Sequence, residues 1–338
     1  MNNFGYFRAS DIAQAVQAGQ APAVHFLAGG TNLVDLLKYE VAHAAALVDI
    51  NRLPLRTIEE LPGGGLRLGA LVSNAGTAYD ARVQARYPLL SSAILAGASA
   101  QLRNAATNGG NLNQRTRCLY FYDPASPCNK RTPGAGCSAL RGTNRGLAIL
   151  GASENCLATY PGDMAVALAV LKAQVRVTGP AGERVIALAD YHRLPGNTPE
   201  IDNVLQPGEL ITAIDLPAEG FAQHYTYLKL RDRLSYAFAL VSVAVGLRLA
   251  ANGTIAEARI ALGGVAAKPW RVPEAEVVLL GQRPSPETFG AAATRLLAGA
   301  LGQGENDFKI ELAHRAIVRA CRQAAAGTPQ SQTDKHIR

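Results

Sequence analysis

The chain has 338 residues, of which 48% are hydrophobic and 17% are charged. At roughly 100–200 residues per domain, this length predicts two domains, and the apolar content excludes global disorder. No uncharged apolar run of about 18 residues occurs, which excludes a membrane span. Segment 1–10 lacks the apolar stretch and the small-residue cleavage site of a secretory signal, so we expect no export signal in this chain.

Positive charge is concentrated in the middle of the chain. The formal net charge is +7, and seven cations stand against one acid between Arg103 and Arg145. A concentrated positive field predicts a concentrated anionic partner, such as nucleic acid, a phosphorylated cofactor or an anionic metal cluster. This segment is rich in Gly and Pro and lacks the interleaved aromatic residues of a nucleic-acid groove, so nucleic acid is the least favoured of the three.

The hydrophobic periodicity predicts alternating helices and strands, interrupted by an irregular segment at 104–144. In the first domain we expect helices at 11–18, 33–41, 89–95 and 164–172, and strands at 24–27, 47–50, 66–71, 147–150, 175–177 and 184–186. In the second we expect strands at 225–231, 241–249 and 258–262, and helices at 286–301 and 307–325. An irregular segment as long as 104–144 is far above the usual loop length and predicts a functional or a disordered region.

Two glycine-containing loops are candidate sites for an oxyanion. The first, Leu27-Ala28-Gly29-Gly30-Thr31-Asn32-Leu33, joins a predicted strand to a predicted helix, where backbone N–H groups and the helix dipole favour an anion. Alone, this segment is more typical of an ordinary strand-to-helix turn. The second, Thr107-Asn108-Gly109-Gly110-Asn111-Leu112, predicts a backbone nest whose donors point one way. Because both loops fall in one predicted domain, they favour a shared diphosphate ligand.

Four of the five cysteines fall within or beside the basic segment: Cys118, Cys128, Cys137 and Cys156. Their spacing matches no zinc finger or zinc ribbon. Disulfides are disfavoured because the chain lacks a secretory signal. Four thiolates on zinc, or on an iron–sulfur cluster, would make an anionic site that suits the surrounding positive charge. Metal ligation is therefore favoured over buried structural cysteines, whereas we expect Cys321 to be a core residue.

The two glycine loops together closely resemble the two flavin-binding loops of the FAD-binding medium subunits of molybdenum hydroxylases, the xanthine dehydrogenase family. Pro161-Gly162-Asp163 looks like the family's acidic FAD contact at a helix start. Gly208-Glu209-Leu210-Ile211 resembles the segment whose apolar residue lies on the flavin, and 227–231 resembles the entry into the C-terminal domain. The resemblance covers residues 1 to about 325.

The cysteine loop, residues 113–156, departs from most of that family. It is similar to the loop of periplasmic aldehyde oxidoreductase medium subunits, which carry an extra [4Fe-4S] cluster. This resemblance implies that Cys118, Cys128, Cys137 and Cys156 bind such a cluster. It further implies that the charges of Arg117, Lys130 and Arg131 tune its potential.

The resemblance implies an α+β fold with two domains. Residues 1–222 would form a two-lobed FAD-binding domain of the vanillyl-alcohol-oxidase-like (PCMH) type, with lobes at about 1–55 and 56–222. Residues 223–326 would form a smaller sheet-plus-helices domain of the CO-dehydrogenase-flavoprotein type, followed by a polar tail at 327–338. The implied FAD contacts are Leu27, Ala28, Gly29, Gly30, Thr31, Asn32, Leu33, Thr107, Gly110, Asn111, Asp163, Leu210, Ile211 and Lys229.

The implied function is electron transfer within an aldehyde oxidoreductase. A molybdopterin-binding large subunit would oxidise the aldehyde, a [2Fe-2S] small subunit would pass the electrons on, and FAD here would deliver them to an external acceptor, with Lys229 stabilising the reduced flavin. Neither nucleic acid nor a membrane is expected as a partner. The protein would be periplasmic if co-exported with a signal-bearing partner and otherwise cytoplasmic. The alternatives are a zinc-braced assembly or scaffold subunit without redox activity, and a stand-alone flavin oxidase, for which no substrate base can be nominated.

Overall fold

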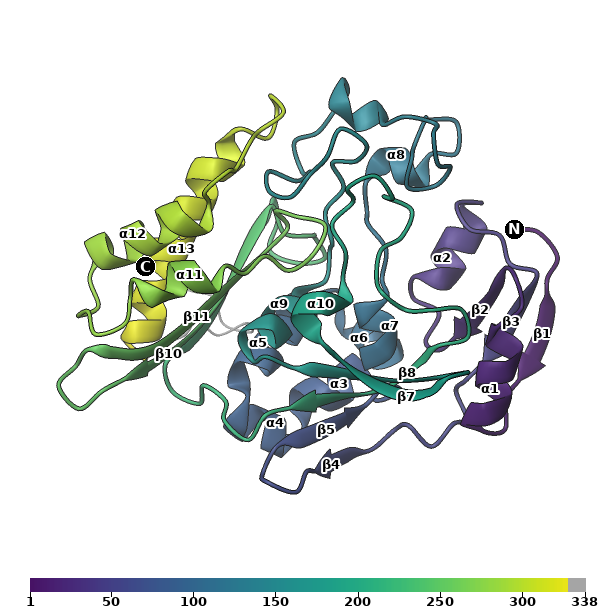
Figure 1. Cartoon of the computed structure of the whole chain (residues 1–338), viewed down its shortest axis with the longest axis horizontal. Coiled ribbons are helices and arrows are strands. Elements are labelled where there is room, and N and C mark those ends of the chain that lie inside the picture. Colours follow the sequence, from purple (N-terminus) through teal and green to yellow (C-terminus); the bar gives the residue numbers. More distant parts are fainter. Residues whose placement is uncertain (328–338) are drawn as a thin grey trace.

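The first lobe is a three-stranded parallel sheet in the computed structural model, which describes residues 1–327 (Figure 1). Strands β1 (Gly5–Arg8), β2 (Val24–Leu27) and β3 (Ala46–Asp49) lie in the order β1-β3-β2. Parallel neighbours need crossover connections, which α1 (Ile12–Gly19) and α2 (Leu33–Lys38) provide.

A five-stranded antiparallel sheet forms the second lobe, in the order β4-β5-β8-β6-β7. Its strands are β4 (Ile58–Glu60), β5 (Leu66–Gly69), β6 (Gln174–Gly179), β7 (Gly182–Ala187) and β8 (Leu210–Leu216). The associated helices are α3 (Asn74–Tyr79), α4 (Ala81–Arg86), α5 (Pro88–Ala96), α6 (Ala100–Ala105), α7 (Asn108–Leu112), α9 (Asp163–Val170) and α10 (Leu188–Tyr191). The strands and helices share one core that includes Leu68, Leu90, Leu168 and Ile214. Burying each such side chain contributes roughly 1.5–3 kcal/mol.

The C-terminal region is a three-stranded antiparallel sheet covered on both faces. Strands β9 (Tyr225–Leu230), β10 (Val241–Leu249) and β11 (Ile255–Gly263) lie in the order β11-β10-β9. Helices α5 and α9 contact one side of this sheet, while α13 (Phe308–Ala325) contacts β9 and β10 and is joined by α12 (Pro286–Leu296) and α11 (Pro273–Val277) in a second core. Since both faces are covered, residues 241–247 are buried without alternation.

The segment predicted to be irregular contains short helices. Helices α6, α7, α8 (Leu119–Tyr122) and a 3₁₀ turn at Ser138–Leu140 fall within or across 104–144. Each is too short to produce a detectable hydrophobic period. Figure 1 shows the α8 region projecting above the five-stranded sheet and the C-terminal sheet, close to α2.

The element boundaries correct several sequence predictions. Residues 147–150 do not form a strand, because the backbone N–H groups of Ile149 and Leu150 both donate to the Val265 carbonyl instead of joining a ladder. The helix expected at 33–41 ends at Lys38, before Glu40 adopts a positive φ of 58°. The helix expected at 286–301 ends at Leu296.

Two sequence predictions concern the ends of the chain and the membrane. The polar tail predicted at 327–338 lies outside the described residues, apart from Gly327. Within residues 1–327, no helix combines the length and the apolar character needed to cross a bilayer.

Candidate functional site

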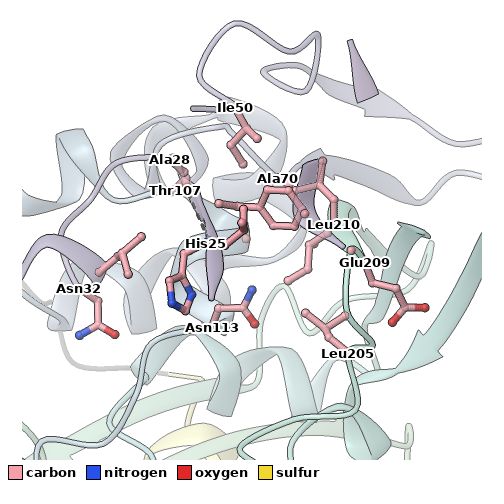
Figure 2. Close-up of a pocket in the computed structure, with 18 of the residues that line it drawn as sticks. His25, Ala28, Asn32, Ile50, Ala70, Thr107, Asn113, Leu205, Glu209 and Leu210 are labelled. Atoms are coloured by element: carbon pink, nitrogen blue, oxygen red, sulfur yellow. Dashed lines mark hydrogen bonds between the residues drawn. The ribbon is translucent and has the colours of Figure 1, made fainter. Parts of the chain in front are cut away.

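A cavity of about 790 Å³, here called the large cavity, opens between the first lobe and the five-stranded sheet. Figure 2 shows that its walls come from the β2–α2 turn, from α7 and from the start of β8. The predicted FAD contacts that line it are Ala28, Gly29, Gly30, Thr31, Asn32, Leu33, Thr107, Gly110, Leu210 and Ile211. Leu27 and Asn111 lie beside lining residues but do not line the cavity themselves. The structure therefore brings together glycine loops that lie far apart in the sequence.

The first glycine loop presents free backbone donors to the large cavity. Among the described residues, no hydrogen-bond partner is found for the backbone N–H groups of 29–32. Gly29 permits this arrangement because a side-chain Cβ there would overlap the carbonyl oxygen of Ala105. Gly30 has a φ of 72°, which favours glycine. Because residues 29–32 line the large cavity and are only partly buried, their N–H groups are available to an oxyanion ligand.

The second glycine loop is not the nest that its sequence predicts. It forms the short helix α7, in which the Thr107 hydroxyl accepts a hydrogen bond from the N–H of Gly110 at 3.2 Å. The N–H groups of Asn108 and Gly109 donate to the carbonyls of Val72 and Ala70. The donors of this loop are therefore used within the protein. The loop contributes a stretch of cavity wall without a side chain at Gly110. A Cβ added there would contact only the Thr107 hydroxyl within the protein.

Asp163 and Lys229 do not line the large cavity. The Lys229 ammonium donates to Oδ2 of Asp163 at 2.8 Å and to the Ala96 carbonyl at 3.2 Å. The Tyr227 hydroxyl donates to Oδ1 of Asp163 at 2.6 Å. Asp163 also lines a second cavity of about 310 Å³, here called the small cavity. The structure pairs these two residues with each other and places Asp163 at the small cavity, apart from the glycine loops. Their predicted contacts with FAD stay predictions.

Helix α7 and Tyr160 connect the walls of the two cavities. Tyr160 lines the small cavity, and its hydroxyl donates to the carbonyl of Asn111 in α7 at 2.9 Å. Burial raises the pKa of Tyr160, so the hydroxyl stays protonated and keeps donating. Helix α7 therefore lines the large cavity directly and contacts the wall of the small cavity through Tyr160.

The four clustered cysteines line one further cavity, here called the cysteine cavity: Cys118, Cys128, Cys137 and Cys156. All four are free thiols, and the backbones of Cys128 and Cys137 pair as an isolated antiparallel bridge. Burial raises the pKa of the Cys156 thiol to about 11, against the opposing effect of the Lys130 charge. Within residues 1–327, no three His, Cys, Asp or Glu side chains stand close enough together to hold one metal ion.

Sequence reasoning missed several residues around these cavities. The polar residues His25, Asn113 and Glu209 and the apolar Leu205 line the large cavity, and Figure 2 shows Leu205 and Glu209 across the view from Asn32. Asp202 pairs with both Arg115 and Lys130. Residues 193–206 have no helical or strand period, so no sequence signal singled out Asp202.

Known families match almost the whole chain. Residues 2–219 match the family described as FAD binding domain in molybdopterin dehydrogenase. Residues 225–324 match the CO dehydrogenase flavoprotein C-terminal domain.

Two curated proteins and one solved structure are similar to this chain over almost its full length. Aldehyde oxidoreductase FAD-binding subunit PaoB of Escherichia coli K12 is 48% identical over 330 residues, covering 96% of this chain and 99% of that protein. The carbon monoxide dehydrogenase medium chain of Afipia carboxidovorans is 26% identical over 332 residues, covering 96% and 97%. A solved structure of reconstituted CO dehydrogenase from Oligotropha carboxidovorans has a TM-score of 0.75 at 25% identity, covering 97% of this chain and 99% of that one.

Proposed function

The chain belongs to the FAD-binding medium subunits of the molybdenum hydroxylase family, and from this premise we propose that it carries electrons from the iron–sulfur centres of a partner to an external acceptor. One observation supports the proposal most directly. Residues 29–32, whose four N–H groups have no hydrogen-bond partner within residues 1–327, and Gly110 line one cavity large enough for a dinucleotide.

Different residues of the large cavity would contact different parts of FAD. The N–H groups of 29–32 would donate to the pyrophosphate, and Gly110 would let the cofactor approach α7. Leu210 and Ile211 supply the apolar wall expected against a ring system. FAD held by these residues would supply the link between one-electron centres and a two-electron acceptor.

The small cavity supplies a second proposed contact with FAD. Asp163 is one of its two acidic lining residues, with Asp232, and we assign Lys229 the role of orienting the Asp163 carboxylate rather than touching the cofactor directly. This assignment follows from the 2.8 Å ion pair and the near-complete burial of the lysine.

The substrate class and the partners rest on the relatives. The similar E. coli protein is an aldehyde oxidoreductase subunit, so we propose an aldehyde as the substrate, oxidised on a molybdopterin-binding large subunit and linked to this chain by a [2Fe-2S] small subunit. We propose domains at 1–222, with lobes at about 1–55 and 56–222, and at 223–326. A signal-bearing partner would take the complex to the periplasm; without one it would be cytoplasmic.

We further propose that Cys118, Cys128, Cys137 and Cys156 hold a [4Fe-4S] cluster. Their free thiols all line one cavity, yet no three of the described ligand-type side chains are close enough for a single ion. In a four-iron cluster each cysteine binds a different iron, so its ligands stand further apart than the ligands of zinc. The zinc-braced alternative fits this arrangement less well.

Metal and flavin analysis of the purified full chain tests both assignments. We expect a yellow-brown protein that releases FAD on denaturation and contains about four irons per chain. A colourless protein with one zinc would overturn the cluster assignment and support a scaffold role. A protein with iron but without flavin would overturn the assignment of the large cavity.

A further inference from the structure

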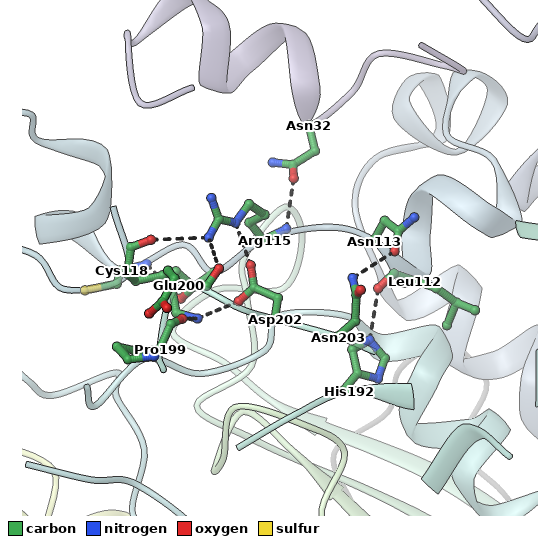
Figure 3. Close-up of polar contacts among 12 residues, drawn as sticks. Asn32, Leu112, Asn113, Arg115, Cys118, His192, Pro199, Glu200, Asp202 and Asn203 are labelled. Atoms are coloured by element: carbon green, nitrogen blue, oxygen red, sulfur yellow. Dashed lines mark hydrogen bonds and ion pairs between the residues drawn. The ribbon is translucent and has the colours of Figure 1, made fainter. Parts of the chain in front are cut away.

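The Asp202 carboxylate is shared between two cations from the basic segment (Figure 3). Its Oδ2 lies 2.5 Å from Nε of Arg115, and its Oδ1 lies 2.5 Å from Nζ of Lys130. These partners are 87 and 72 residues away in the sequence. One carboxylate thus joins the segment before β8 to two points of the cysteine loop.

Lys130 links Asp202 to the cysteine cavity. The residue lines that cavity, and its side chain is only 5% exposed. Its ammonium also donates to the carbonyl of Pro199 at 2.6 Å. The charge of Lys130 acts on the Cys156 thiol. A buried cation in the wall of this cavity is poorly screened, so the carboxylate that partly neutralises it affects the field in the cavity.

Arg115 links Asp202 to the large cavity. The residue lines that cavity, and its backbone N–H donates to Oδ1 of Asn32, in the first glycine loop, at 2.9 Å. Its guanidinium lies over the Phe121 ring at 4.7 Å and also donates to the Glu200 carbonyl. Figure 3 shows Asn32, Arg115 and Asp202 in one line of contacts. The position of Arg115 therefore depends on both Asn32 and Asp202.

We propose that Asp202 is a positioning residue shared by the two sites: its carboxylate fixes the Lys130 ammonium at the cysteine cavity and the side chain of Arg115, a residue that lines the large cavity and whose backbone holds Asn32. The inference rests on the proposed function, because it assumes a cluster in the first cavity and FAD in the second. Each reduction adds negative charge to its cofactor. Removing the carboxylate leaves both sites more positive, which favours the reduced forms. The cluster responds more strongly than the flavin, since Lys130 is more buried than Arg115.

Redox titration of the purified full chain tests this role, with the cluster followed by EPR and the flavin by absorbance. We expect Asp202→Asn to raise the midpoint potential of the cluster and, to a smaller extent, that of FAD. Lys130→Gln should shift the cluster potential the opposite way, because it removes the positive charge. Asp202→Glu, which keeps the charge, should restore most of the wild-type potential.

Asp215 offers a matched control. Its carboxylate is also held by two cations, Arg67 and Arg176, but it lies in β8 away from the cysteine cavity. Asp215→Asn should therefore leave the cluster potential unchanged. An equal shift in Asp215→Asn and Asp202→Asn would mean general loosening of the fold and would overturn the proposal.

The remaining outcomes separate this inference from the proposed function. If the wild-type chain holds no iron, the cluster assignment fails and this inference fails with it. If the wild-type chain holds iron and FAD but Asp202→Asn leaves both potentials unchanged, only the role of Asp202 is wrong. Should Asp202→Asn not fold, Lys130→Gln decides: a lowered cluster potential supports the inference and an unchanged one overturns it.

Discussion

The Lys229 ammonium lies 2.8 Å from the Asp163 carboxylate, with 1% of the lysine side chain and 10% of the aspartate side chain exposed. Lys229 comes from β9 and Asp163 from the start of α9, so the pair joins the C-terminal sheet to the helical layer of the FAD-binding domain. The two residues thus contact each other across this boundary without any cofactor.

Loss of one partner should destabilise the protein strongly. Lys229→Met leaves a buried carboxylate without its cation, which we expect to lower the free energy of unfolding by about 3–5 kcal/mol. Urea unfolding of the cofactor-free chain measures this change. The double variant Lys229→Met/Asp163→Asn should recover much of the loss. An unchanged unfolding midpoint in Lys229→Met would mean that the ion pair does not stabilise the fold.

Substitutions at two glycines should separate folding from FAD binding. At Gly110 a side chain meets only the Thr107 hydroxyl and otherwise faces the cavity, so Gly110→Val should fold but lose FAD. At Gly29 a Cβ overlaps the Ala105 carbonyl, so Gly29→Ala should destabilise the fold as well. Flavin absorbance per chain, with the thermal unfolding midpoint, distinguishes the two.

A third glycine serves as the control for this series. Gly290 lies within α12, where a Cβ would be 3.9 Å from the nearest atom, on His314. Gly290→Ala should keep full flavin content and stabilise the helix by up to about 1 kcal/mol. Stoichiometric FAD in Gly110→Val would show that this wall of the large cavity does not face the cofactor.

The cysteine assignment predicts unequal effects of two similar substitutions. Cys128→Ser removes a proposed cluster ligand at the cysteine cavity, so iron per chain should fall sharply while the large cavity still binds FAD. Cys321→Ser changes a thiol buried in the second core, away from that cavity, and should leave the iron content unchanged. Iron analysis beside flavin absorbance checks both. Full iron in Cys128→Ser would contradict its role as a ligand.

The predicted α+β fold, with a two-lobed FAD-binding domain and a CO-dehydrogenase-flavoprotein domain, is confirmed. The first glycine loop was predictable because its signals are local: an apolar strand ends at Leu27, and a helix begins at Leu33. Helix α7 was not, since two adjacent glycines disfavour a helix. It forms because Thr107 caps it and because Gly109 allows close packing against Ala70 and Ile211.

Contacts between distant segments mark the limit of the sequence argument. The clustering of the cysteines along the chain pointed to one loop, and the structure places all four at one cavity. The pairing of Asp163 with Lys229 depends on how α9 packs on the C-terminal sheet, where it contacts β10 and β11. The pairing of Asp202 depends on a loop without periodicity. No local pattern encodes either contact, because each needs the tertiary fold to bring charges together.

His192 should make the stability of the protein depend on pH in the mildly acidic range. The ring packs between Tyr160 and Tyr191, with centroid distances of 4.3 and 4.9 Å. Its Nε2 lies 2.9 Å from the Leu112 carbonyl, which identifies Nε2 as the protonated nitrogen. Within the described residues Nδ1 has no partner, so a second proton there would find no acceptor.

Burial lowers the pKa of His192 from 6.5 to about 4. Between these values the unfolded chain binds a proton that the folded chain does not, so stability falls as the pH drops from 6.5 towards 4. The loss amounts to about 3 kcal/mol in full. His192→Phe keeps the ring packing and removes the titration. Urea unfolding at pH 7.5 and 4.5 should therefore show wild type losing more stability than the variant, and equal losses would place the His192 pKa near its ordinary value.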